Sequence, residues 1–106
     1  MAWTIGFHEA ARSEYLDLPA ELQARLERIT VLIEAHGLEH LPGKFARHIE
    51  GRLWEFRLKG KDGIARALYV TVSGRRIVIV RVFVKKTQKT PRREIQLALE
   101  RAEEIA

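Results

Sequence analysis

Arg66 is the first residue of this chain whose position calls for a chemical explanation. It interrupts an apolar alternation formed by Ile64, Leu68 and Val70. A guanidinium that approaches a protein core needs an ionic partner or an anionic ligand. Glu55 is a candidate partner, and pairing with it would make both residues structural. The alternative is a phosphate, whose oxygens match the planar fork of guanidinium donors. We expect Arg66 to face a ligand.

A lysine-rich loop follows the last β-branched stretch of the chain. Residues 82–91 read VFVKKTQKTP, so three lysines and two hydroxyl groups lie between a predicted strand and a predicted helix. Backbone amides at a helix N-terminus add their own preference for anions. Because Arg57 and Arg66 lie on neighbouring predicted strands, we expect them to share one phosphate-binding site with this loop.

Histidine is the side chain best suited to proton transfer near neutral pH, with an ordinary pKa of about 6.5. Of the four histidines, His48 lies within the basic middle of the chain. It is a candidate general acid or base, a phosphate contact, or a partly exposed structural residue. His36 and His40 have the spacing of two metal ligands on a helix, but Gly37 should break the helix between them. We expect no metal site.

The basic charge is concentrated in one part of the sequence. The net charge is +5, yet residues 44–93 contain fifteen of the nineteen lysines and arginines and only three of the fourteen acidic residues. A field of one sign repels itself and weakens the folded state. An anionic partner is therefore expected, most commonly a nucleic acid and next an acidic protein segment. A solvated charged face without a partner is the remaining alternative.

Length and composition indicate one globular domain spanning residues 1–106, because the chain has 106 residues of which 46% are hydrophobic. The absence of cysteine excludes disulfides and thiolate metal sites. No apolar run approaches the roughly 18 residues of a membrane span, and residues 1–9 lack the pattern of a secretory signal. We expect a cytoplasmic protein.

The N-terminal third predicts a strand followed by two helices. Residues 3–8 contain aromatic and β-branched side chains typical of a strand, and a helical pattern of residues begins at Glu9. Pro19 suits the first turn of a second helix, which Gly37 should end. The apolar residues of this helix recur at spacings of four, three and four, and they are Leu22, Leu26, Ile29 and Ile33.

The rest of the chain predicts three antiparallel strands and a final helix. A period of two places Trp54, Phe56 and Leu58 on a core face and Glu55, Arg57 and Lys59 on a charged face. Turns at residues 61–63 and 73–74 lead to strands over 64–72 and 77–84. Thr90 is the expected N-cap of the last helix, with Pro91 at its first position. The predicted class is α+β, ordered β-α-α-β-β-β-α, with a small antiparallel sheet packed on helices.

Three segments resemble the signatures of a known family. LWEFR at 53–57, ARALY at 65–69 and FVKKTQKTP at 83–91 are similar to those of the HigB-like, phage-derived branch of the RelE/ParE superfamily of toxins from type II toxin–antitoxin systems. The resemblance covers roughly residues 40 to 100. It implies the same sheet-and-helix fold. Many members cleave messenger RNA on the translating ribosome without a metal, and a small antitoxin silences them.

The resemblance implies that Arg57, Arg66 and the pair Lys85-Lys86 line the RNA site. We predict a metal-independent endoribonuclease that cleaves messenger RNA, on the ribosome, through attack by the ribose 2′-hydroxyl. The predicted catalytic residues are His48, Arg57, Arg66 and Lys85. The predicted RNA and phosphate contacts are Lys44, Arg47, Lys86, Gln88, Lys89 and Tyr69, the last of which is alternatively a stacking or core residue.

Two other function classes remain open at this stage. The superfamily contains inhibitors of DNA gyrase that perform no RNA chemistry, and a non-catalytic RNA-binding module would carry the same charges. The expected partners are messenger RNA, the ribosome and a cognate antitoxin, HigA-like and carrying a helix-turn-helix domain. No membrane, small-molecule ligand or cofactor is expected.

Overall fold

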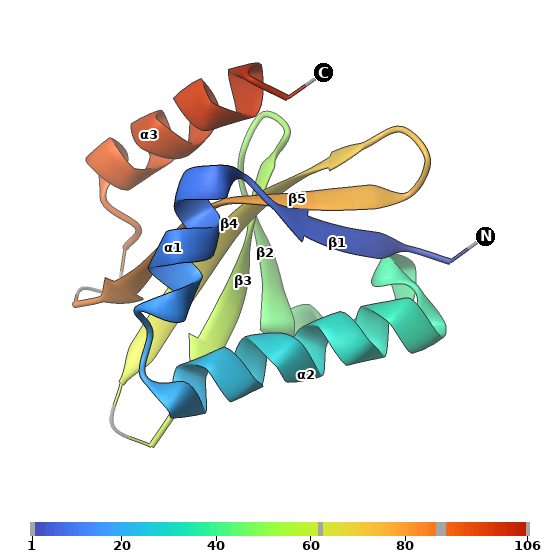
Figure 1. Cartoon of the computed structure of the whole chain (residues 1–106), viewed down its shortest axis with the longest axis horizontal. Coiled ribbons are helices and arrows are strands. Elements are labelled where there is room, and N and C mark those ends of the chain that lie inside the picture. Colours follow the sequence, from blue (N-terminus) through green and yellow to red (C-terminus); the bar gives the residue numbers. More distant parts are fainter. Residues whose placement is uncertain (1, 62, 87–88, 106) are drawn as a thin grey trace.

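The computed structural model describes residues 2–61, 63–86 and 89–105. Five strands form one sheet in the order β1-β5-β4-β3-β2, with helices on both faces (Figure 1). The elements are β1 (Thr4–Phe7), α1 (Glu9–Leu16), α2 (Ala20–His36), β2 (Ala46–Glu50), β3 (Leu53–Lys59), β4 (Ile64–Val72), β5 (Arg76–Lys85) and α3 (Arg92–Glu103). Two short 3-10 helices, Leu38–His40 and Gly43–Phe45, connect α2 to β2. The predicted α+β class is confirmed.

Helices α1 and α2 cover one face of the sheet, which we call the α2 face. All four residues of the predicted apolar stripe on α2 are buried, because their spacing keeps them on one side of the helix. They pack against buried residues of β3, β4 and β5 that include Phe56, Tyr69 and Ile79. Gly37 ends α2 with a φ of 91°, a left-handed value that glycine adopts without a steric penalty.

Helix α3 covers part of the opposite face, which we call the α3 face. Ala98 and Ala102 pack there with residues that include Leu53, Leu68 and Val70. The small alanine side chains allow the helix to approach the sheet closely. The cover is incomplete, because Arg57 and Lys59 at the end of β3 are exposed on this face.

An ion-pair network joins α1 and α3 across the edge of β5. Strand β1 pairs with β5 only as far as Ile79, so the next part of that edge is free for other partners. There Glu14 accepts a hydrogen bond from the Val82 amide at 3.0 Å and another from Arg101 at 2.9 Å. Arg81 contacts Glu14 and also donates to Glu94 at 2.7 Å. The network therefore fixes α3 relative to the sheet.

The structure has one strand more than predicted, because β2 was not recognised. Its sequence, ARHIE, lacks a clean alternation, and the register shifts between His48 and Glu50. The turn into β3 uses Gly51 with a φ of 55°. Strand β1 runs parallel to β5, whereas the pairs β2 with β3, β3 with β4 and β4 with β5 are antiparallel.

One expectation for β3 and one for α3 are wrong. Trp54 was expected in the core but is 40% exposed, because it lies beside the short edge strand β2. Glu55 lies on the charged face, as expected, and is fully buried there. Thr90 does not cap α3: Pro91 is the N-cap and Arg92 the first helical residue. The Thr90 hydroxyl instead donates a hydrogen bond to Glu55 at 2.8 Å, which removes it from the helix end.

No helix in the described part of the chain has the length and apolarity needed to span a membrane.

Candidate nucleic-acid interface

Four basic side chains gather on the α3 face, and we call them the basic cluster: Arg47, Arg57, Arg66 and Lys85. Arg57 lies directly opposite Arg66 in the register of β3 and β4. Arg47 lies opposite Glu55, the residue two positions before Arg57, and residues two apart on a strand share a face. The positive charges of Arg66, Arg57 and Arg47 all act on Lys85. Strand register thus brings together four cations from four strands.

Glu55 holds Arg66 in place from beneath the basic cluster. Its Oε2 lies 3.4 Å from Arg66 Nε, and both side chains are almost completely buried. Arg66 Nη1 donates to the Ala65 carbonyl at 3.2 Å. The partner considered from the sequence is therefore present. The guanidinium nevertheless lines an open hollow, so the ion pair and a role in binding are compatible.

Burial and like charges weaken proton binding in the cluster. Burial lowers the pKa of Arg66, the charges of Arg57 and Arg47 lower it further, and Glu55 opposes them. The pKa of Lys85 is also below its ordinary value, first because of burial and then because of Arg66. Each added anion would relieve this repulsion, so the cluster favours a ligand with negative charge.

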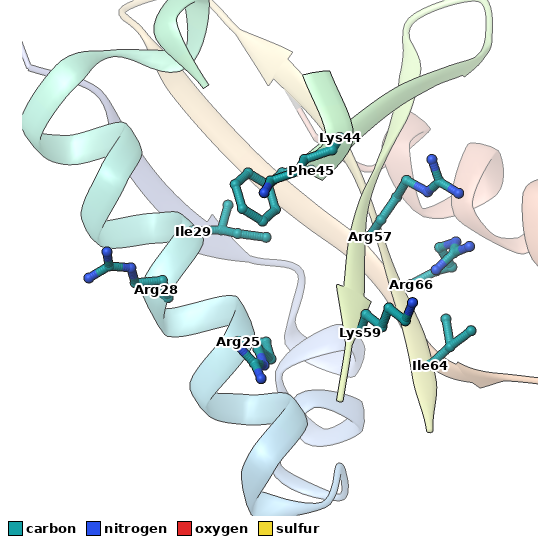
Figure 2. Close-up of a pocket in the computed structure, with 9 residues that line it drawn as sticks. All are labelled: Arg25, Arg28, Ile29, Lys44, Phe45, Arg57, Lys59, Ile64 and Arg66. Atoms are coloured by element: carbon teal, nitrogen blue, oxygen red, sulfur yellow. The ribbon is translucent and has the colours of Figure 1, made fainter. Parts of the chain in front are cut away.

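A hollow of about 660 Å³ adjoins the cluster, and we call it the basic hollow. Its lining residues are Arg25, Arg28, Ile29, Lys44, Phe45, Arg57, Lys59, Ile64 and Arg66 (Figure 2). Six of these nine side chains are basic and none is acidic. Figure 2 shows α2 on one side of the hollow and, beyond β3, the side chains of Arg57 and Arg66. A polyanion fits this lining better than a neutral ligand.

The remaining predicted contacts fall in different places. Lys44 lines the basic hollow, with its Nζ 5.2 Å from the centre of the Phe45 ring. Lys86 and Lys89 are exposed on either side of the undescribed pair at 87–88. Gln88 lies outside the described residues. The lysine loop therefore starts from the basic cluster at Lys85.

His48 and Tyr69 do not join the cluster. His48 lies opposite Trp54, which lies opposite Tyr69, so all three face the α2 side. The His48 ring is 5.1 Å from that of Trp54, and its Nε2 lies 2.7 Å from the Gly51 carbonyl oxygen. Tyr69 is buried and stacks on Phe56 at 3.9 Å, and burial raises the pKa of its hydroxyl. The geometry therefore gives no support to the RNA roles expected for His48 and Tyr69. It agrees with the alternative role of Tyr69 as a core residue.

Three cations of the hollow were not predicted as site residues: Arg25, Arg28 and Lys59. Arg25 and Arg28 flank the apolar stripe of α2 and come from the acidic third of the chain. A count of net charge for each sequence segment does not reveal these arginines, because a helix from an acidic segment can bring its cations beside a distant strand. Among the described residues, no group of three or more histidine, aspartate or glutamate side chains is arranged to hold a metal ion.

Comparison with known proteins places this architecture in a family. The model of the family described as phage derived protein Gp49-like (DUF891) matches residues 13–103. The chain belongs to this Gp49-like family. The family match confirms the phage-derived relationship expected from the three sequence segments. No curated protein matches the chain.

Two solved structures share the fold of this Gp49-like protein. A mutant of the E. coli toxin RelE in the free state is 16% identical, with a TM-score of 0.62 and full coverage of both chains. The archaeal RelE from Pyrococcus horikoshii, crystallised in a RelE–RelB complex, is 21% identical with a TM-score of 0.57, over 79% of this chain and 96% of that chain. The chain thus has the RelE-like toxin fold, and at these identities the likeness concerns the fold alone.

Proposed function

We propose that this Gp49-like protein is the toxin of a toxin–antitoxin pair and that it cleaves RNA at the basic cluster. The observation that carries the proposal is the convergence of Arg47, Arg57, Arg66 and Lys85 beside a hollow whose charged lining is entirely basic. The RelE-like fold supports it, since one protein with this fold is named a toxin and another was crystallised with RelB.

RNA carries its own nucleophile, the ribose 2′-hydroxyl. The protein therefore needs only to align this oxygen with the scissile phosphate and to stabilise the transition state. The ribose 2′-hydroxyl gives its proton to solvent water and attacks the adjacent phosphorus while the bond to the leaving 5′-oxygen breaks. Arg57 and Arg66 hold the non-bridging oxygens, where negative charge grows in the transition state. This electrostatic stabilisation requires cations in fixed positions. The ion pair with Glu55 fixes the position of the Arg66 guanidinium.

Lys85 is the titratable group best placed to serve the leaving oxygen. It shares the cluster with Arg66, and its pKa is below the ordinary lysine value, which makes its ammonium a stronger acid. In this mechanism it replaces His48, which faces the other side of the sheet. Lys86 and Lys89 bind the neighbouring backbone.

The proposed setting is the cytoplasm, with messenger RNA on the ribosome as substrate and a helix-turn-helix antitoxin as partner. An antitoxin that neutralises this protein must cover or compensate the basic cluster. The gene beside the one for this chain provides a direct check, because a short reading frame for a helix-turn-helix protein is expected there.

Inducible expression followed by mapping of messenger RNA 5′ ends tests the proposal. New 5′ ends should appear after induction of the wild type and disappear in Arg57→Gln. If induction causes DNA damage without new 5′ ends, the proposed RNA cleavage is wrong and inhibition of DNA gyrase is supported instead. RNA binding without product in a purified translation system would reduce the protein to a binding module.

The salt dependence of binding to single-stranded RNA provides a second measurement. If the site contacts about five phosphates, the log–log slope should be roughly −3.5, or about a hundredfold loss of affinity between 50 and 200 mM salt. A flat response would contradict a site built on backbone contacts.

A further inference from the structure

The basic hollow continues past the proposed reaction site to helix α2. Arg25 and Arg28 are three residues apart, so their side chains are neighbours on the helix surface. Both are exposed, and neither forms an ion pair within the described ranges. A solvent-facing pair of unpaired arginines that lines the same hollow as Arg57 and Arg66 extends the positive surface beyond the catalytic cluster.

The end of β3 separates the two parts of this surface. Strand β2 pairs with β3 only as far as Phe56, so the remainder of β3 is an edge of the sheet on that side. An edge strand presents unpaired backbone groups to whatever lies beside it. Figure 2 shows Arg57 and Lys59 at this edge, with α2 across the hollow. Between the two groups of cations the hollow is lined by Lys44, Phe45 and Lys59.

We propose that the RNA strand crosses this edge and that Arg25 and Arg28 bind phosphates flanking the cleavage site. This inference rests on the proposed function, and it specifies the substrate as a single strand several nucleotides long. A flexible polyanion can follow a surface that turns round a strand end, whereas a rigid duplex cannot bend so sharply. An acidic protein segment is the competing occupant, and the test below distinguishes the two.

Binding of two RNA lengths to a double variant tests the path. We compare Arg25→Gln/Arg28→Gln with Arg12→Gln/Arg76→Gln, which removes the same charge outside the hollow. Glutamine has nearly the helix propensity of arginine, so α2 should remain intact. The probes are a fluorescent trinucleotide and a dodecamer, both fully 2′-O-methylated to prevent cleavage.

The α2 variant should bind the dodecamer with a salt slope shallower by about 1.4, since each lost single-strand contact removes about 0.7. Its affinity for the trinucleotide should equal that of the wild type. The control variant should keep the wild-type slope. On an unmodified RNA of the same length, KM should rise while kcat is unchanged, because these arginines do not touch the reacting phosphate.

Equal slopes for the α2 variant and the wild type would overturn the proposed path across the edge of β3. Cleavage by the wild type in that case would leave the proposed function standing. A wild type that binds the methylated dodecamer but cleaves no unmodified messenger RNA in a purified translation system would overturn the nuclease, while the slopes still decide the path. Absence of any salt-dependent RNA binding would overturn both.

Discussion

The two faces of β3 differ in chemistry over a span of four residues. On the α2 face, Trp54 and Phe56 join an aromatic group with His48 and Tyr69. On the α3 face, Glu55 and Arg57 belong to a group of charges. The difference teaches that residue type alone does not identify a site residue. Strand alternation directs His48 and Tyr69 to the α2 face, away from the charged group.

The largest effect is expected for Arg66→Ala. The change leaves the buried Glu55 carboxylate without its partner, which typically costs about 3–5 kcal/mol. Cleavage should also be lost. Urea unfolding measures the first effect and RNA cleavage the second. In Glu55→Gln/Arg66→Met, stability should recover while cleavage remains absent, and recovery of cleavage would contradict the role of Arg66.

Arg57→Gln separates chemistry from stability on the same face. Arg57 is exposed and has no ion pair within the described residues, so the free energy of unfolding should change by no more than about 0.5 kcal/mol. The single-turnover cleavage rate should fall on the order of a hundredfold, because one preorganised charge is lost. Arg12→Gln on α1 serves as the control. If Arg57→Gln cleaves RNA at the wild-type rate, the proposed role of the α3 face in cleavage is wrong.

Lys85→Arg should change the pH dependence of cleavage. Burial and then Arg66 lower the pKa of Lys85 below 10.5, so the wild-type rate should fall with rising pH earlier than an ordinary lysine would allow. Arginine stays protonated throughout, which removes a titrating donor and should leave a slower, flatter profile. Lys61→Arg, in the turn after β3, should retain the wild-type curve. An unchanged profile in Lys85→Arg would exclude Lys85 as the donor.

The same shift affects stability with a defined sign. The folded protein binds the Lys85 proton less tightly than the unfolded chain does. Stability should therefore rise as pH increases from the lowered pKa towards 10.5. Comparison of wild type and Lys85→Gln by urea unfolding across this interval isolates the contribution of this residue. A contribution that falls with pH would contradict the direction of the shift.

Thr90→Val tests how firmly the end of the lysine loop is held on the α3 face. The variant loses the 2.8 Å hydrogen bond to Glu55, at a cost of about 1–2 kcal/mol. Thr90→Ser keeps the hydroxyl and should retain most of the stability. Thermal unfolding of the three proteins provides the comparison. Unchanged stability in Thr90→Val would show that the hydrogen bond to Glu55 does not stabilise the fold.

The smallest effect is expected on the opposite face. His48→Gln should cleave RNA within about twofold of the wild-type rate, because the residue is an exposed surface position on the α2 face. Tyr69→Phe should behave in the same way, since the ring stacks on Phe56 and its hydroxyl has no place in the cluster. A large loss of cleavage in either variant would show that the reaction uses the α2 face.

Local patterns predicted much of the fold but only part of the site. The helical stripe of α2 and the turn at residues 73–74 depend on neighbouring residues, and the structure confirms them. The predicted turn at 61–63 includes Asp62, which lies outside the described residues. The burial of Glu55 depends on partners far away in the chain, Arg66 and Thr90. Strand β2 pairs with its neighbour β3 but lacks the alternation that would have identified it. No pattern around residue 55 distinguishes a buried carboxylate from an exposed one.

The amino-acid order by itself determined the α+β class, the family signatures and the placing of Arg57 and Arg66 on adjacent antiparallel strands. Those features follow from periodicity and turn chemistry, which act over a few residues. Only the tertiary structure decided that Arg25 and Arg28 line the same hollow as Arg57, and that His48 lies on the other side of the sheet. The physical reason is that strand register and helix packing set which faces meet, and both are determined by contacts between distant parts of the chain.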